Sequence, residues 1–199
     1  MKIFKNQIIE LIKGEAFNEF LISTNSNFFN IKQELIIRNY LVQSLNSSSK
    51  QLKAFAEYPR ENNKKVDLSI IDHRTGTIEY QIEIKFQYPK DVIIWHSFDS
   101  TIDNILNQRS FNGKKIDLLI LVISEWNNDE YVKYCNKVCV KSTLTKYQKT
   151  KKDWISTLEN DLQTREFDVE RFDIQISSPI MTNYYFYLIE KKVSAQHCI

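Results

Sequence analysis

The sequence predicts a single α/β domain, residues 1–199, in which a mixed central sheet is flanked by helices. Three observations lead to this prediction. Helical periodicity covers about 6–22 and about 31–45, two β-rich segments separated by a polar turn follow at 65–72 and 78–85, and an apolar run at 118–123 comes after another helical stretch. The core order is therefore helix, three strands, helix and strand, with C-terminal additions.

Two helices open the chain. A helical pattern covers residues from about 6 to 22, with Gly14 as a weak point, and a polar connection follows at 23–27. The second helix is predicted from about 31 to 45 and ends at the polar loop 46–49. Both helices precede the first predicted strand.

A short strand and a hairpin come next. The strand covers 52–58 and is closed by Pro59. The arms of the hairpin, 65–72 and 78–85, are rich in Val, Ile and Tyr, and the segment 73–76 between them has turn-forming residues. Two antiparallel strands are therefore expected.

The hairpin brings charged side chains together. Facing residues of an antiparallel pair have numbers that sum to a constant, so a turn centred near residue 75 places Asp67 opposite Glu83, within a residue or two. Successive side chains of a strand point to opposite faces. The second arm then has a polar face, with Glu79, Gln81, Glu83 and Lys85, and an apolar face, with Ile78, Tyr80, Ile82, Ile84 and Phe86.

The second half of the chain continues with mixed patterns. A helix is predicted from about 100 to 109, Asn112-Gly113 marks a turn, and the apolar run lies in a strand at 115–123. The remaining predicted elements are a polar strand at about 137–141, a helix at about 151–164, and strands at 172–176 and 184–190.

Composition indicates a globular protein outside membranes. The 199 residues are 42% hydrophobic and 26% charged, which suits one packed domain. The longest apolar run, 118–123, is far shorter than the roughly 18 to 20 residues that span a bilayer. The first seven residues have no signal-peptide pattern, so a cytoplasmic location is expected. Three cysteines without a CxxC pair indicate neither a disulfide framework nor a zinc site.

A net charge of +2 does not by itself indicate a polyanionic partner. A local basic run nevertheless contains Lys146, Tyr147, Lys149, Lys151 and Lys152. Two interpretations have equal weight: a solvated start of a helix, or a patch that contacts nucleic-acid phosphates.

Glu34 falls within the apolar stripe of the second helix. At 100° per residue it lies between Leu41 and Leu45, and Arg38 follows one turn later. A carboxylate turned toward a core costs several kcal/mol unless it is paired or binds a cation. Either a Glu34–Arg38 ion pair or a metal-binding role satisfies this requirement.

The hairpin carboxylates suit divalent-cation chemistry. Mg²⁺ prefers oxygen ligands and is commonly held by only one or two carboxylates, a set that Asp67 and Glu83 provide. Lys85, on the same face as Glu83, would stabilise charge developing on a phosphate or activate a water. The alternative is that these residues form only the solvated face of an amphipathic strand.

Val66-Asp67, followed by Glu83-Ile84-Lys85, resembles the PD-(D/E)XK superfamily of restriction-endonuclease-like nucleases. The resemblance covers about 31–123, and the core order of that superfamily is helix, three strands, helix, strand. It implies that Asp67, Glu83 and the backbone carbonyl of Ile84 bind metal and that Lys85 orients the hydrolytic water. Glu34 would match a helix glutamate beside the metal, and Gln87 would assist. Val66 replaces the proline of the motif name.

The expected function is a Mg²⁺-dependent endodeoxyribonuclease, with Mn²⁺ as a possible substitute, of the restriction or phage-defence kind. DNA is the expected partner, a homodimer is expected, and no small-molecule cofactor or membrane is involved. One alternative is a structure-selective repair, recombination or mobile-element nuclease. An alternative of another class is a catalytically silent binding module on the same fold. Residues 124–199 are expected to serve target recognition or dimerisation.

Overall fold

The computed structural model describes residues 2–61, 64–94, 102–111, 113–150, 153–165 and 167–192. Its helices are α1 (Lys2–Lys13), α2 (Glu15–Phe28), α3 (Glu34–Ser48), α4 (Pro89–Ile94), α6 (Asn128–Lys137) and α7 (Trp154–Gln163), with a π-helical turn η1 (Asn104–Gln108) and a 3-10 turn η2 (Leu144–Tyr147). Its strands are β1 (Leu52–Ala56), β2 (Arg60–Glu61), β3 (Lys64–Lys65), β4 (Leu68–Asp72), β5 (Thr77–Gln87), β6 (Ser110–Phe111), β7 (Lys114–Lys115), β8 (Leu118–Trp126), β9 (Phe167–Ile176) and β10 (Thr182–Lys191).

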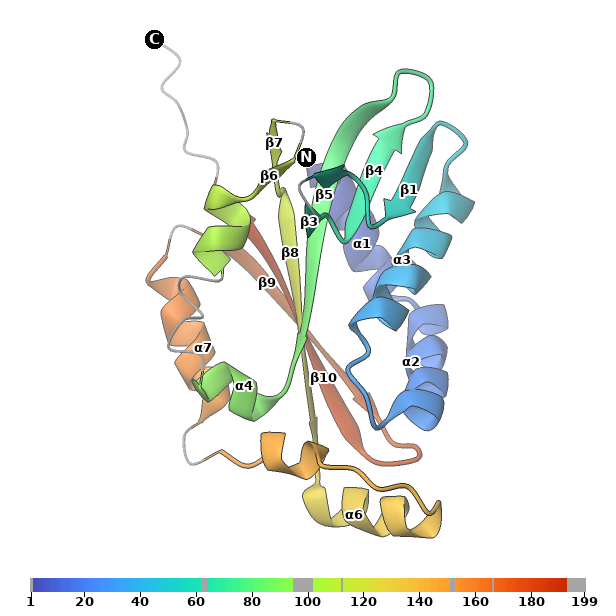
Figure 1. The fold of residues 1–199 in the computed structure, drawn as a ribbon, viewed down its shortest axis with the longest axis vertical. Coiled ribbons are helices and arrows are strands. Elements are labelled where there is room, and N and C mark those ends of the chain that lie inside the picture. The colour runs from blue at the N-terminus through green and yellow to red at the C-terminus, as the bar shows by residue number, and fades with distance from the viewer. Residues whose placement is uncertain are drawn as a thin grey trace.

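A six-stranded mixed sheet with the order β1-β4-β5-β8-β10-β9 forms the centre of the molecule (Figure 1). Strands β5 and β8 are parallel, and the other neighbours are antiparallel. The α/β class and the helix-flanked mixed sheet are thus confirmed. The C-terminal strands extend the same sheet, because β10 pairs directly with β8.

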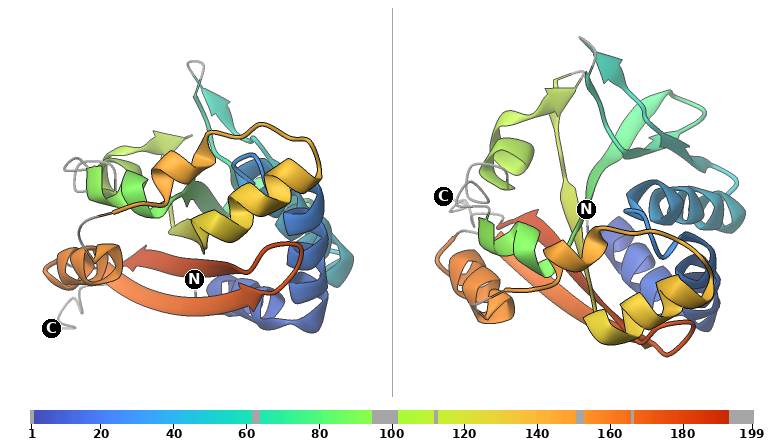
Figure 2. Two further views of the ribbon diagram at one scale, coloured as in Figure 1. Left: turned by 90° about the horizontal axis from the view of Figure 1, so that it is seen from below. Right: turned by 60° about the horizontal axis from the view of Figure 1, so that its bottom comes forward.

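Helices cover both faces of the sheet (Figures 1 and 2). On one face, side chains of α1, α2 and α3, such as Ile8, Phe17 and Leu41, join one hydrophobic cluster with the sheet. On the other face, Leu158 of α7 and Ile105 of η1 belong to a second cluster. The sheet is therefore buried on two sides, which explains the near-continuous apolar sequence of β8.

Strand β5 has the two predicted faces. Tyr80, Ile82, Ile84 and Phe86 belong to the cluster beneath α1–α3, whereas the intervening residues point to the opposite face. That second face is not a solvated one, because Gln81, Glu83 and Gln87 are all buried. The interpretation as an ordinary solvent-facing strand is therefore wrong.

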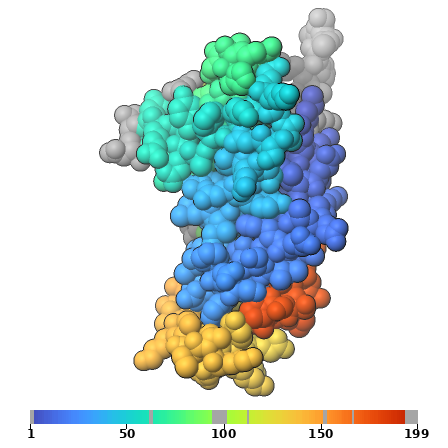
Figure 3. All heavy atoms as spheres, turned by 90° about the vertical axis from the view of Figure 1, so that its right-hand side faces the viewer, coloured from blue at the N-terminus to red at the C-terminus, as the bar shows by residue number. Residues whose placement is uncertain are grey.

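The predicted first helix is two helices that meet at Gly14. Its backbone is extended there, with φ −70° and ψ 149°, and α2 then runs on to Phe28. The predicted connection at 23–27 is wrong, because Asn25 is buried and its amide donates to the Ser178 and Ile180 carbonyls in the β9–β10 turn. Figure 3 shows that turn and α6 below α2 and α3.

Three other predicted elements differ. The strand at 137–141 is wrong: these residues end α6 and follow it, because Asn127 caps the helix and Tyr131 and Cys135 bury its inner side. The helix at 100–109 is described only from residue 102 and includes the π-helical turn η1. The strand predicted at 172–176 begins earlier, at Phe167.

Within the described ranges, every helix is too short or too polar to cross a membrane.

A candidate active site at the free edge of β5

Strand β5 continues beyond the end of its partner β4. Their pairing extends to Leu68 opposite Ile82, whereas β5 runs on beside β8 as far as Gln87. The register places the next pair at Asp67 and Glu83, as the hairpin predicted. Beyond Ile82, no strand of the described residues pairs with this edge of β5.

Two carboxylates take the place of the missing strand. Asp67 Oδ2 accepts the N–H of Ile84 at 2.9 Å, and Glu34 Oε2 accepts the N–H of Phe86 at 3.0 Å. Asp67 immediately precedes β4, and Glu34 is the first residue of α3. An unpaired buried backbone N–H costs as much as a lost hydrogen bond. Both carboxylates therefore stabilise the edge of β5.

Glu83 and Lys85 meet at the same edge. Lys85 Nζ lies 2.8 Å from Glu83 Oε1 and 3.6 Å from Asp67 Oδ2, and it donates to the Ile84 carbonyl at 3.0 Å. The structure thus brings Asp67, Glu83, Lys85 and the Ile84 carbonyl together, as the sequence predicted. Their catalytic and metal-binding roles remain predictions.

Arg109, which follows η1, is a site residue that the sequence did not reveal. Its guanidinium donates to Glu83 Oε1, the same oxygen that binds Lys85. No local sequence pattern predicts that Arg109 contacts Glu83, because the two residues are 26 positions apart in the chain. The second carboxylate oxygen, Glu83 Oε2, is buried and has no hydrogen-bond partner among the described residues. Such an unsatisfied atom costs about 1–3 kcal/mol.

The electrostatics of the site follow from burial and from like charges. Burial raises the pKa of Glu83, and the Asp67 carboxylate raises it further, while Lys85 and Arg109 act in the opposite direction. Burial by itself lowers the pKa of Lys85. The carboxylates of Glu83, Asp67 and Glu34 outweigh burial, so the pKa of Lys85 is raised and its ammonium stays charged.

The donor atoms at this edge suit a hard divalent cation. Asp67, Glu83 and the Ile84 carbonyl offer oxygen atoms only, and Glu83 Oε2 is a buried oxygen that still lacks a partner. Across the described ranges, no group of three or more acidic, histidine or cysteine side chains is arranged to hold a metal ion. Two carboxylates and a carbonyl nevertheless match Mg²⁺, which takes few protein ligands and keeps several waters.

The predicted Glu34–Arg38 pair is not formed. Arg38 NH1 instead contacts Glu57 Oε1 at 3.0 Å, and Glu34 faces the backbone of β5. The predicted apolar arc is also only partly buried, because α3 begins at Glu34 and both Ile31 and Leu35 are exposed. The end of the helix, rather than a hydrophobic stripe, therefore places Glu34 at the site.

The contacts of the other described candidate residues are with different partners. Gln87 Oε1 accepts from Lys32 Nζ at 2.9 Å. Tyr147 stacks on Tyr88 and packs against the core, with Lys146 Nζ 4.9 Å from its ring centroid. Lys149 is exposed. Lys151 and Lys152 lie outside the described residues.

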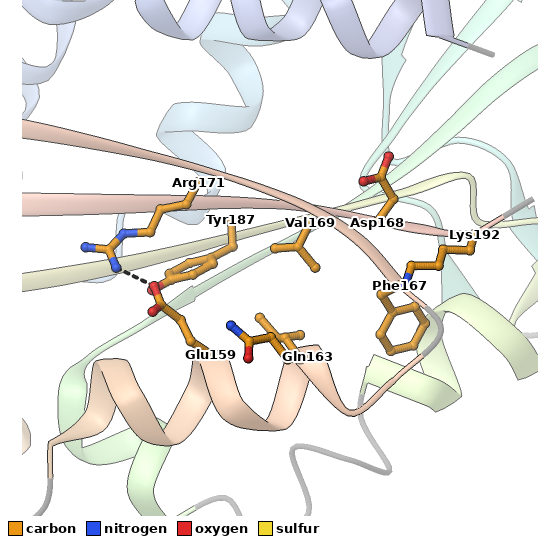
Figure 4. A pocket seen from close by; sticks show the side chains of 9 residues that line it. Glu159, Gln163, Phe167, Asp168, Val169, Arg171, Tyr187 and Lys192 are labelled. Carbon is orange, nitrogen blue, oxygen red and sulfur yellow. Dashed lines mark hydrogen bonds and ion pairs between the residues drawn. The ribbon is translucent and has the colours of Figure 1, made fainter.

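A surface cavity of about 420 Å³ lies elsewhere, between α7 and strands β9 and β10 (Figure 4). Two cations, Arg171 and Lys192, line it; Arg171 points toward Glu159 and is also bound by Asp173 at 2.6 Å. Because Glu159 and Asp173 neutralise Arg171, this arginine does not form an anion site in the cavity.

Comparisons with protein-family models, with curated proteins and with solved structures found no match to this chain.

Proposed function

We propose that this protein is a Mg²⁺-dependent nuclease that hydrolyses DNA phosphodiester bonds at the edge of β5. One observation carries the proposal: Asp67, Glu83, Lys85 and the Ile84 carbonyl converge where β5 has lost its partner strand, beside a buried carboxylate oxygen without a hydrogen bond. A purely structural edge does not require so many interacting charges, since each carries a desolvation penalty.

Each residue has a distinct role in this proposal. Asp67, Glu83 and the Ile84 carbonyl would hold the cation, which when bound supplies Lewis-acid stabilisation of phosphate charge and lowers the pKa of a bound water. Lys85 is already held by Glu83 and the Ile84 carbonyl, so its ammonium is fixed in direction and can orient a water or stabilise negative charge. Glu34 keeps the β5 backbone in place through the Phe86 N–H.

The order of elements supports membership of the PD-(D/E)XK superfamily. Helix α3, strands β1, β4 and β5 and strand β8 follow the order expected for its core, and the hairpin arms contribute Asp67 and Glu83 as expected. The short strands β2 and β3 are inserted between β1 and β4, and between β5 and β8 the chain forms α4, η1, β6 and β7, of which η1 lies in the predicted helix at 100–109. Fold order alone does not define a substrate. DNA is proposed because the site suits phosphodiester hydrolysis, with a restriction or phage-defence role as the first candidate.

A cleavage assay tests the proposal. Purified protein is incubated with linear, branched and single-stranded DNA and with RNA, in Mg²⁺, Mn²⁺ or EDTA. We expect cleavage of DNA with either metal and none with EDTA, and a loss of at least about a hundredfold in rate for Lys85→Ala. Cleavage by Lys85→Ala and Glu83→Ala at the wild-type rate would exclude this active site. Preference for a branched substrate would favour the repair or recombination alternative.

A silent nucleic-acid-binding module remains a second candidate because of one observation. Lys85 and Arg109 pair with Glu83 without any metal, and Asp67 and Glu34 cap the β5 backbone. These contacts alone would hold the edge together. DNA binding without cleavage in either metal would support the module.

A further inference from the structure

A cluster of cations surrounds a single carboxylate next to the candidate site. Glu57 follows β1 with a φ of 56°, and its carboxylate contacts Arg38 NH1 at 3.0 Å, Arg60 NH2 at 2.8 Å and Lys65 Nζ at 2.5 Å. Hydrogen bonds from Lys65 and Arg38 lower the pKa of Glu57, so it stays ionised. Three positive charges against one negative charge leave an excess of two. We call these four residues the Glu57 cluster.

The Glu57 cluster is connected directly to the candidate ligands. The Glu57 N–H donates to the Asp67 carbonyl at 3.0 Å, and the Val66 N–H donates to the Pro59 carbonyl at 3.2 Å. Asp67 in turn reaches β5 through the Ile84 N–H. The β2–β3 hairpin, which contributes Arg60 and Lys65, projects from the body of the molecule in Figure 2.

The cluster contains more cations than the fold requires. The Arg38 side chain is 8% exposed and is sufficient to neutralise Glu57, whereas those of Arg60 and Lys65 are 68% and 47% exposed. Surface ion pairs of this kind contribute little to stability. Two exposed cations beside a neutralised carboxylate therefore remain available to a polyanion.

Aromatic side chains on the same segment indicate which polyanion. Phe55 and Tyr58 are both exposed, and their ring centroids lie 6.2 Å apart. Bases stack on exposed aromatic rings while cations follow the phosphates, which is the combination that binds nucleic acid. An acidic peptide would use the cations but not the aromatic pair in this way.

We infer that the Glu57 cluster binds backbone phosphates of DNA adjacent to the scissile bond, with Phe55 and Tyr58 contacting neighbouring bases. The inference rests on the proposed nuclease function, because it places the DNA strand across the start of β4 beside Asp67. Arg60 and Lys65 make the phosphate contacts, and Arg38 holds Glu57 in place.

Charge-neutral variants test the inference without any cleavage. The double variant Arg60→Gln/Lys65→Gln is compared with Arg74→Gln/Lys133→Gln, which removes the same charge from exposed positions outside the cluster. Binding of a fluorescent DNA duplex and a single strand is measured by anisotropy in EDTA over a range of salt concentrations. We expect the cluster variant to bind about tenfold or more weakly and to lower the slope of log K against log salt by about one to two. The control variant should retain the wild-type slope.

Thermal unfolding verifies that both double variants are folded. Equal DNA affinity and equal salt slope for the two variants overturn the inference. Binding of an acidic peptide is measured in the same way, and a cluster variant that loses peptide binding but keeps DNA binding also overturns it. Tyr58→Ala in the otherwise wild-type protein should also weaken binding of the single strand, and an unchanged affinity would exclude the aromatic contact. If the wild type cleaves DNA but the cluster variant binds DNA with wild-type affinity, only this inference is refuted. Absence of cleavage by the wild type refutes the proposed function instead.

Discussion

Asp67 combines a structural and a proposed chemical role in one side chain. Its Oδ2 atom accepts the Ile84 N–H, and the same carboxylate lies within 3.6 Å of Lys85 Nζ. Glu34 Oε2 likewise accepts a backbone hydrogen bond, from the Phe86 N–H. A carboxylate that the fold needs is thereby held beside Lys85, so substitutions can separate its structural role from the proposed role in cation binding.

Asp67→Asn should separate stability from activity. The asparagine retains an oxygen for the Ile84 N–H but lacks the negative charge, so we expect the free energy of unfolding to change little and cleavage to be lost. Asp67→Ala removes both, and the unpaired N–H should cost about 1–3 kcal/mol. Chemical denaturation and the cleavage assay measure the two effects. Equal destabilisation by both substitutions would show that the hydrogen bond is unimportant.

Arg109→Gln should strengthen cation binding. The Arg109 guanidinium occupies Glu83 Oε1 and adds positive charge where a cation would bind. Its removal eliminates both the competition and the repulsion, so we expect tighter Mg²⁺ or Mn²⁺ binding by calorimetry. Arg74→Gln, at an exposed turn, is the control. Weaker cation binding by Arg109→Gln would contradict competition at Glu83.

At the scale of elements, the lengths of β4 and β5 create the site. The strands are joined by a turn, and their register shifts once, between Ile70 and Ile71. Because β5 extends past the start of β4, its last residues can bond to side chains rather than to a strand. A one-residue slip would turn Glu83 toward the apolar core.

The turn itself should respond to acid through Asp72. Its carboxylate accepts from Gln51 Nε2 at 2.7 Å and from the Arg74 N–H at 2.9 Å, and these bonds lower its pKa from 3.8 to about 2. A lowered pKa in the folded state contributes stability above pH 3.8, and this contribution is lost as the pH falls through about 2.

The free energy of unfolding, measured from neutral pH to pH 2, should therefore fall more steeply for wild type than for Asp72→Asn. The difference between the two proteins should become much smaller as the pH approaches 2. Parallel pH profiles would show that Asp72 does not fix the turn.

At the scale of the whole molecule, the candidate site joins distant parts of the chain. Glu34 comes from α3 and Arg109 from the segment after η1, two elements on opposite sides of the central sheet, and Asp67 is the residue just before β4. A cation that binds only this assembled arrangement stabilises the folded state through mass action.

Mg²⁺ should consequently raise the unfolding temperature of the wild type. At a hundredfold excess over its dissociation constant, a bound ligand adds about 2.7 kcal/mol of stability. Asp67→Asn and Glu83→Gln should show no such shift, and K⁺ at matched ionic strength controls for screening. A Mg²⁺-dependent shift of equal size in both variants would place the cation elsewhere.

The sequence by itself determined the local part of this protein. Alternation along 78–86, the turn at 73–76 and the register that brings Asp67 next to Glu83 depend on local backbone geometry, which short segments encode. Lys85 followed from the same alternation. The prediction of a strand at 137–141 failed because an N-cap at Asn127 and a buried i, i+4 pair form the helix α6 from a polar segment, and this helix ends at Lys137.

Only the tertiary structure decided which distant groups meet. Arg109 reaches Glu83 from 26 positions away, Arg38 pairs with Glu57 rather than with Glu34, and Glu34 bonds to the Phe86 N–H. The physical reason is that these contacts depend on where helices pack against the sheet and where one strand ends beside another. That packing is determined by hydrophobic burial among residues from the whole chain, so the periodicity of a short segment does not predict it.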